Sequence, residues 1–401
     1  PAERLPAALD LLAEMVLHPV FPEREVERLR DERLNDLLQA RADPRRRADE
    51  AFVETIYADS SPYHRPGGGV RETVERLDPQ ILRTTYERSL DPAGAAFVVG
   101  GDLRGLDPLR ELDRLFGGWT GKSGDGVATS TIDDRAARPD RIVRVIHRPG
   151  SVQTEIRIGH RALSRRIPDF HALTVMSAIL GGLFNSRLNM KLREEKGYTY
   201  GAGAGFDLRR AAGPFAARAA VNTEVTVPAV EETMAELRRM RDSSVGDEEL
   251  AAARDFLVGV FPLRFETAGA VVGSIAGLVV HGLPLDEIVR YRDAIEAVTI
   301  DQVRAAATAH LHVDEAAIVL VGDADAFGAA LESSGLGPIV IERDEAPAAP
   351  GPIPGEEELA SPVDEDDDTG PTAGTEDPEL PGSAGPAEPG TSNDASIAPT
   401  D

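Results

Sequence analysis

The sequence predicts an α+β protein made of two homologous lobes, each a mixed or antiparallel sheet with helices packed on one face. Residues 26–102 can be laid over residues 247–323 at one constant offset of 221, which indicates a duplicated unit. Within each copy, helical stretches with one apolar stripe precede a short buried strand-like run. Because strands and helices are mixed and do not strictly alternate, we expect α+β lobes.

Composition excludes several classes of protein. Of the 401 residues, 41% are hydrophobic and 28% are charged, which is ordinary for a globular protein, and no cysteine is available for disulfides or thiolate metal sites. No apolar run approaches the length of a membrane span. The net charge is −26, but residues 344–401 hold 16 acidic and no basic residues. The rest of the chain is only mildly acidic, which gives no support for nucleic-acid binding.

Domain limits follow from the repeat and from composition. We expect a first lobe at 1–120, a linker at 121–139, a second lobe at 140–343 and a disordered, acidic, proline-rich tail at 344–401. At the same offset Pro1 corresponds to Asn222, so the first lobe lacks a counterpart of about 80 residues. The sequence does not determine the compartment; a soluble protein of the bacterial cytoplasm or periplasm is expected.

The individual elements are predicted from apolar periodicity and end signals. First-lobe helices are expected at 6–17, 23–42, 48–57 and 79–89. The second lobe is expected to hold strands at 141–147, 153–160 and 214–222, and helices at 168–180, 183–196, 228–241, 248–258, 268–280 and 285–294. Each copy then has a helix begun by Asp78-Pro79 or Thr299, followed by a strand ending in Gly-Asp.

The stretch 181–206 combines a helix, a glycine stop and a strand. Leucines recur at helical spacing in its first half, and Gly197 follows the last helical turn. Alternation after Gly197 predicts a strand. Arg193 on the last helical turn and Tyr200 just inside the strand can both face one concave spot.

This stretch closely resembles the pitrilysin/insulinase family of zinc peptidases, the inverted zincins. In that family a helix ends in L-R-x-x-x-G-x-x-Y, and the matching residues here are Leu192, Arg193, Gly197 and Tyr200. The resemblance covers roughly residues 1–343. It implies one two-lobed half of a clam-shell metalloendopeptidase that encloses oligopeptides. It also implies that Arg193 and Tyr200 bind the peptide substrate and stabilise the oxyanion formed during hydrolysis.

Two glycines extend this expected substrate site. Gly201 and Gly203 lie in a run of small residues directly after Tyr200. They do not form a dinucleotide-binding loop, because no helix follows them. We expect instead that they let a substrate strand approach closely.

The zinc site is expected outside the residues present. Catalytic members carry H-x-x-E-H on a helix and a further glutamate as a ligand, but none of the eight histidines stands in that pattern. Asn35 and Asp36 occupy the place of that glutamate. His310 and His312 are the nearest approach to a metal pair and have no carboxylate cluster nearby in sequence. The resemblance therefore implies zinc on a partner half, fused or separate, or on the missing N-terminal segment.

Two other functions stay open on the sequence. Similar two-lobed chains serve as non-catalytic scaffold or core subunits of respiratory complexes, a role that needs no oxyanion donors. The chain is alternatively a self-sufficient zinc peptidase shortened at its N-terminus. In the structural alternative, the Arg193 guanidinium binds the helix C-terminus and Tyr200 caps a sheet edge.

Overall fold

The computed structural model describes residues 2–121, 132–136 and 140–343. The described residues all lie within one compact unit, Pro1–Ala349. Most of the expected linker and the whole acidic tail lie outside the described residues.

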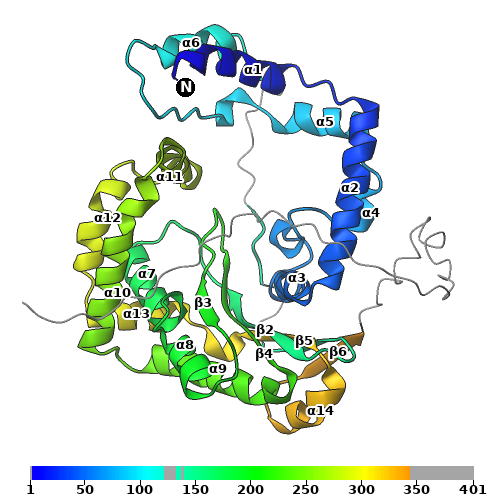
Figure 1. Cartoon of the computed structure of the whole chain (residues 1–401), viewed down its shortest axis with the longest axis vertical. Coiled ribbons are helices and arrows are strands. Elements are labelled where there is room, and N and C mark those ends of the chain that lie inside the picture. Colours follow the sequence, from blue (N-terminus) through cyan, green and yellow to red (C-terminus); the bar gives the residue numbers. More distant parts are fainter. Residues whose placement is uncertain (1, 122–131, 137–139, 344–401) are drawn as a thin grey trace, which may run out of the picture. The chain divides into compact units, whose positions relative to one another are not determined.

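One six-stranded mixed sheet is the centre of the fold (Figure 1). Its strand order is β3-β4-β2-β5-β1-β6. Strand β1 runs parallel to both β5 and β6, whereas β2 runs antiparallel to β4 and β5, and β3 antiparallel to β4. The strands are β1 Val143–His147, β2 Gln153–Arg161, β3 Ala202–Phe206, β4 Pro214–Asn222, β5 Ala317–Gly322 and β6 Ile339–Arg343. All six come from the predicted second lobe, and β3 and β6 are the edges.

The helices agree with the periodicity of the sequence in most places. Those of the first lobe are α1 Leu5–Leu17, α2 Glu23–Ala42, α3 Pro44–Ile56, α4 Arg71–Val74, α5 Pro79–Ser89 and α6 Pro108–Phe116. Those of the second are α7 Phe170–Ser177, α8 Arg187–Asn189, α9 Thr226–Asp242, α10 Asp247–Val260, α11 Ala268–His281, α12 Glu287–Glu296, α13 Ile300–His310 and α14 Ala324–Ser333.

No single described helix is both long enough and apolar enough to cross a membrane. The broken pair Asp247–Phe265 and Ala268–His281, bent by 111°, meets the length and composition test only when its two parts are taken together.

Helix positions reproduce the repeat inferred from the sequence. Helix α5 and helix α13 coincide residue for residue at the offset of 221. Both begin at the predicted signals, because the side chain of Asp78 accepts from the Ile81 N–H and that of Thr299 accepts from the Gln302 N–H. At the same offset α1 falls on α9, α2 on α10 and α3 on α11, each within a few residues. The duplication is therefore present in the helices.

Helices of the second lobe cover one face of the sheet, as predicted, and a helix of the first lobe covers the other. One face packs into a large core with α7, α9 and α13. The other packs against α3, whose Ala48, Ala51 and Phe52 share a second core with Val319 and Val321 of β5. Buried polar groups fix α3 there. Arg157 of β2 donates to Asp49 at 2.6 Å and to the Arg45 carbonyl at 3.3 Å.

The strand predicted at the end of the first copy does not form, so the expectation of a sheet in each lobe is wrong for the described residues. Residues 95–100 lie outside every strand, whereas their counterpart β5 lies between β1 and β2. The described first lobe holds no equivalents of β1 to β4, so these residues have no ladder to join.

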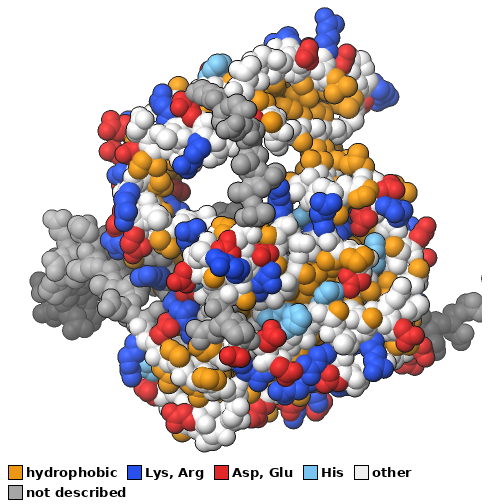
Figure 2. Space-filling model, turned by 180° about the vertical axis from the view of Figure 1, so that it is seen from behind, with side chains coloured by type: hydrophobic (Ala, Val, Ile, Leu, Met, Phe, Trp, Pro, Cys, Tyr) orange, Lys and Arg blue, Asp and Glu red, His pale blue; other side chains and the backbone are white. Residues whose placement is uncertain are grey.

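Apolar side chains of the first lobe consequently stay exposed. They gather over its helices (Figure 2), where Leu11 is 68% and Met15 73% exposed. Leu109 on α6 is 79% exposed. Contiguous exposed apolar surface of this kind is typical of a surface that other protein covers.

A buried histidine predicts how stability depends on pH. The Nδ1–H of His160 donates to the Arg161 carbonyl at 2.8 Å, and its Nε2 accepts from the His312 N–H at 3.1 Å. Burial lowers the pKa of His160 to about 4. Because an unfolded histidine has a pKa of about 6.5, the unfolded state binds more protons between these values. The free energy of unfolding should therefore fall as the pH drops from about 6.5 to about 4.

Urea denaturation at pH 7 and pH 5 tests this. In His160→Gln the loss of stability between the two pH values should be smaller by about 2 kcal/mol, whatever the variant's stability at pH 7. The exposed His18 offers a matched control, His18→Gln, which should keep the wild-type loss. An equal loss in wild type and His160→Gln would contradict the assignment.

Candidate functional site

The helix of the helix–strand junction at 181–206 is partly π-helical. Helix α8 continues as a π-helix, Met190–Glu195, and π-turns occur often at functional sites. Gly197 then ends it with a φ of 66°, as the sequence predicts, and its N–H donates to the Arg193 carbonyl at 3.1 Å. The Tyr198 N–H donates to the Leu192 carbonyl at 2.8 Å. These bonds satisfy the last carbonyls of the helix and fix where the chain leaves it.

Side chains then bind the junction to the sheet. The Asn189 Oδ1 accepts from the Ala202 N–H at 2.7 Å. The Thr199 hydroxyl donates to the Ala220 carbonyl at 2.7 Å and accepts from the Gly201 N–H at 3.1 Å. A second π-helix, η4 Ala178–Gly182, lies so close to β3 that a Cβ on Gly181 would come within 2.1 Å of the Ala204 nitrogen. Only glycine fits there, and the helix therefore contacts the strand through its backbone.

A forked ion pair attaches helix α8 to helix α10. The buried Arg187 donates from Nε to Glu249 Oε1 at 2.7 Å and from Nη2 to Oε2 at 2.8 Å. Glu249 also accepts from the Gly246 N–H at 2.9 Å, which caps α10. The paired guanidinium and this N–H both lower the pKa of Glu249. The carboxylate thus serves two elements at once.

Arg193 and Tyr200 both lie on the surface of this junction. The Arg193 side chain is 36% exposed; its Nε lies 3.4 Å from Glu194 Oε1, and its Cζ lies 4.5 Å from the centre of the Phe184 ring. Tyr200 is 94% exposed. Strand β3 begins at Ala202, so Tyr200 lies in the turn before the strand and not inside it. Neither side chain is enclosed in the interior of its lobe.

Gly201 and Gly203 lie at the edge of the sheet. Gly201 is exposed in the turn, and Gly203 pairs with Arg218 of β4, leaving the other side of β3 unpaired in the described structure. The π-helix Ala178–Gly182 packs beside the same strand, since the Gly181 carbonyl oxygen would lie 3.3 Å from a Cβ on Gly203. Whether a substrate uses the unpaired side of β3 is taken up below.

The other residues considered from the sequence have structural partners. His310 Nε2 lies 2.7 Å from Asp169 Oδ2, and the His312 N–H bonds to His160, so the two histidines do not converge. Asp36 pairs with Arg33 and Arg46 on a partly exposed helix face. Neither place assembles a metal site.

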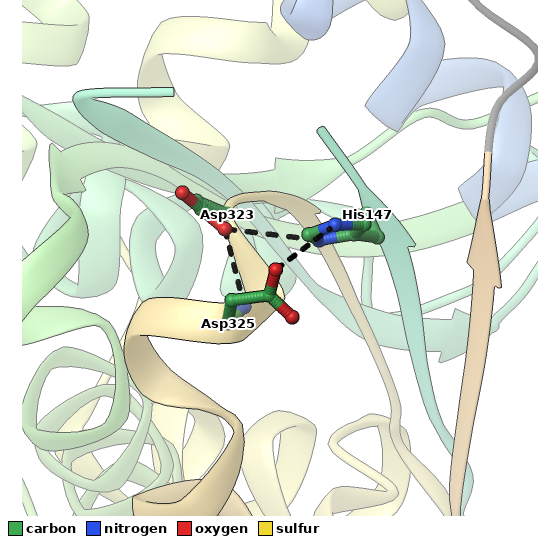
Figure 3. Close-up of side chains that lie close together, drawn as sticks. All are labelled: His147, Asp323 and Asp325. Carbon is green, nitrogen blue, oxygen red and sulfur yellow. Dashed lines mark hydrogen bonds and ion pairs between the residues drawn. The ribbon is translucent and has the colours of Figure 1, made fainter. Parts of the chain in front are cut away.

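The structure brings together one group that sequence reasoning missed, His147, Asp323 and Asp325 (Figure 3). His147 is 2% exposed, and its Nε2 lies 3.6 Å from Asp325 Oδ2 without a hydrogen bond. Its Nδ1, however, accepts from the Ala324 N–H at 3.0 Å. A neutral imidazole that accepts at Nδ1 carries its proton on Nε2, which then cannot bind a metal. These three residues therefore do not fit a zinc ion.

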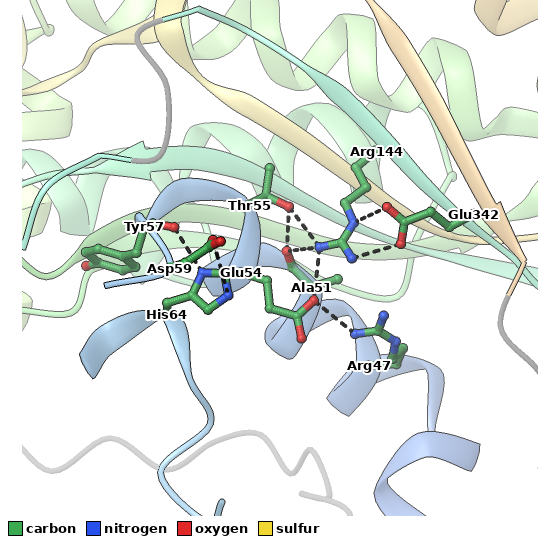
Figure 4. Close-up of polar contacts among 9 residues, drawn as sticks. All are labelled: Arg47, Ala51, Glu54, Thr55, Tyr57, Asp59, His64, Arg144 and Glu342. Atoms are coloured by element: carbon green, nitrogen blue, oxygen red, sulfur yellow. Dashed lines mark hydrogen bonds and ion pairs between the residues drawn. The ribbon is translucent and has the colours of Figure 1, made fainter. Parts of the chain in front are cut away.

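A cavity of about 690 Å³ lies between the end of α3 and β6 (Figure 4). Its charged groups are already paired. Arg144 binds both oxygens of Glu342, at 2.9 and 2.8 Å, and Glu54 at 3.0 Å. These bonds join α3 to the sheet, which is a structural role. The cavity offers no unpaired catalytic group comparable to Tyr200.

The Arg187–Glu249 pair should matter for stability. Arg187→Met should lower the free energy of unfolding by about 1–3 kcal/mol, less than for a fully buried pair because Glu249 is partly exposed. Lys191→Met is the matched control on the same helix, since its partner Glu195 is exposed and the loss should stay below about 0.5 kcal/mol. Urea denaturation measures both. Equal losses would mean that the fork does not anchor the helix.

The fold and this junction together define a class: a mixed-sheet domain of the zinc-peptidase type that exposes an arginine and a tyrosine and offers no fitting zinc ligands among its described residues. Comparison with known proteins agrees. Residues 76–257, which include the whole junction, match the family described as the Peptidase M16 inactive domain. The resemblance to the zinc peptidases inferred from the sequence is therefore confirmed over these residues.

The curated relatives include proteins described as zinc proteases and one described as a non-peptidase homolog. An uncharacterized zinc protease of Streptomyces coelicolor is 25% identical over 313 residues, covering 76% of this chain and 66% of that protein. A protein of Helicobacter pylori described as a non-peptidase homolog is 21% identical over 318 residues, 79% of this chain and 72% of its own length. The chain thus spans about two thirds of the length of the relatives it matches.

The fold is shared with a peptidase M16 inactive domain from Pseudomonas fluorescens. The TM-score is 0.69 at 24% identity, over 79% of this chain and 74% of that one. This likeness establishes the fold alone.

Proposed function

We propose that this chain is the non-zinc half of a zinc metalloendopeptidase and supplies Arg193 and Tyr200 to a peptide held against a zinc-bearing partner. One observation carries the proposal. Both side chains project from a junction that is fixed by backbone and side-chain hydrogen bonds, yet they remain available to another molecule. An exposed phenol and a half-exposed guanidinium contribute little to the chain's own stability, whereas rigid presentation suits catalysis.

The chemistry that this pair can perform is electrostatic. Hydrolysis of a peptide bond builds negative charge on the carbonyl oxygen, and preorganised donors stabilise that charge by up to a few kcal/mol. The guanidinium of Arg193 offers several N–H donors, and the phenol of Tyr200 offers one O–H. Arg193 can also bind a neighbouring carbonyl of the substrate and so orient it.

The edge strand β3 supports extended peptides as the substrate class. A peptide that adds to β3 would pair its backbone beside Gly203, three residues after Tyr200. Glycine at this edge leaves space for the backbone of a substrate strand. The proposed substrate is therefore an extended oligopeptide.

A scaffold role is the second candidate, because one relative is described as a non-peptidase homolog and the matching family as inactive. Such a subunit would hold a partner in place and take no part in hydrolysis. It predicts that replacing Arg193 or Tyr200 leaves the activity of any assembly unchanged.

Mixing experiments separate the two functions. The chain is combined with candidate partners that carry H-x-x-E-H, and hydrolysis of a quenched fluorescent peptide is followed with and without a chelator. Arg193→Ala should lower kcat/KM of the assembly by about 10²–10³-fold, as loss of an oxyanion donor does, and Tyr200→Phe should also lower it.

Stability provides the control for these variants. Because both side chains are exposed, the free energy of unfolding should change by less than about 0.5 kcal/mol. Chelator-sensitive hydrolysis that both variants leave intact would contradict the proposed role. A parallel loss of stability would point to a structural role for Arg193.

A further inference from the structure

Phe184 is an exposed aromatic residue in contact with Arg193. It lies in the turn between the π-helix Ala178–Gly182 and helix α8 and is 70% exposed. The Arg193 Cζ lies over its ring at 4.5 Å from the centre. A guanidinium at this distance is attracted by the negative face of an aromatic ring.

The turn that carries Phe184 is firmly held. The Leu183 N–H donates to the Ala178 carbonyl at 3.2 Å, and the Leu183 carbonyl accepts from the Ser186 N–H at 3.1 Å and from Asn189 Nδ2 at 3.3 Å. The side chain of Leu183 is buried. Since Asn189 also binds Ala202, one residue links the ring's turn to the start of β3. The backbone that carries the ring is thus held in place beside a long, flexible side chain.

Two neighbours compete for the Arg193 guanidinium. Glu194 approaches Nε at 3.4 Å, and a closer ion pair with this adjacent carboxylate would occupy N–H donors. The Phe184 ring instead attracts the face of the guanidinium and leaves the N–H donors at its edge free. The aromatic contact therefore preserves the donors that a substrate carbonyl needs.

We infer that Phe184 is a positioning residue, whose ring holds Arg193 with its N–H donors directed to the substrate. The inference rests on the proposed function for its catalytic meaning, but the contact itself can be tested without a partner. Leucine at 184 keeps the apolar character and much of the volume, whereas tyrosine and tryptophan keep the aromatic face. The comparison separates packing from attraction to the ring.

The first experiment measures the contact by NMR on the ¹⁵N-labelled full chain. The Arg193 Nε–H resonance, assigned with Arg193→Lys, should be displaced upfield by the ring current of Phe184. Phe184→Tyr and Phe184→Trp should keep the displacement, and Phe184→Leu should abolish it. Met190→Leu is the matched control, because Met190 is also an exposed apolar residue of this segment and should leave the resonance unmoved. A resonance that does not respond to Phe184→Leu overturns the inference.

The second experiment measures catalysis in the assembly with a zinc-bearing partner. Phe184→Leu should lower kcat about two- to fivefold with little change in KM, and Phe184→Tyr and Phe184→Trp should restore it. A full effect of Arg193→Ala together with no effect of Phe184→Leu would overturn the positioning role and leave the proposed function standing. An NMR contact that is present while Arg193→Ala leaves activity unchanged would overturn the proposed function and leave only the contact.

Discussion

The candidate site depends on the forked pair between Arg187 and Glu249. Arg187 is buried at the start of the helix that carries Arg193, and both of its bonds to Glu249 are short and charge-assisted. Glu249 caps α10 at the same time, so the position of one helix is tied to the beginning of another. The direct backbone contact of Gly181 with Ala204 then fixes the strand beside them. These buried contacts determine where the exposed residues Arg193 and Tyr200 lie.

This arrangement gives the chain a rigid surface that presents hydrogen-bond donors but, among the described residues, no zinc site. The described residues offer donors that stabilise negative charge but assemble no set of ligands fit for zinc, since His147 Nδ1 accepts from the Ala324 N–H and the Nε2 that faces Asp325 therefore carries the proton. A domain of the kind described as inactive can still take part in catalysis by a partner. Its donors can act on a bond whose electrophile is activated by another module.

Much of this fold was predictable because local rules decided it. Helix α2 and helix α5 begin and end where the sequence predicts, since apolar spacing and capping residues act over short distances. The absence of a strand at 95–100 was not predictable in this way. The sequence there resembles β5, but a strand needs neighbours, and no local pattern says whether they are present.

The site shows the same division. The positions of Arg193 on the last helical turn and of Gly197 as the helix stop follow from spacing, whereas Tyr200, predicted just inside the strand, lies in the turn before it. The contact of Phe184 with Arg193 does not, because it depends on a π-helical turn and on the hydrogen bonds of Leu183 and Asn189. The grouping of His147 with Asp323 and Asp325 joins strands far apart in sequence, and only the sheet order brings them together. Lone Asp-x-Asp spacing carries no such information.

Helix α3 belongs to the first copy of the repeat and yet covers the sheet of the second. The equivalent helix α11 approaches the first copy in the same way: a Cβ on Gly100 would lie 2.8 Å from Val272 Cγ2, and these two residues correspond at the offset of 221 to Val321 and Ala51, which share the core under α3. The two copies have thus exchanged helices. A sequence change on the face of the sheet that α3 covers must be accommodated by a helix from the other copy of the repeat, so the two copies must change together.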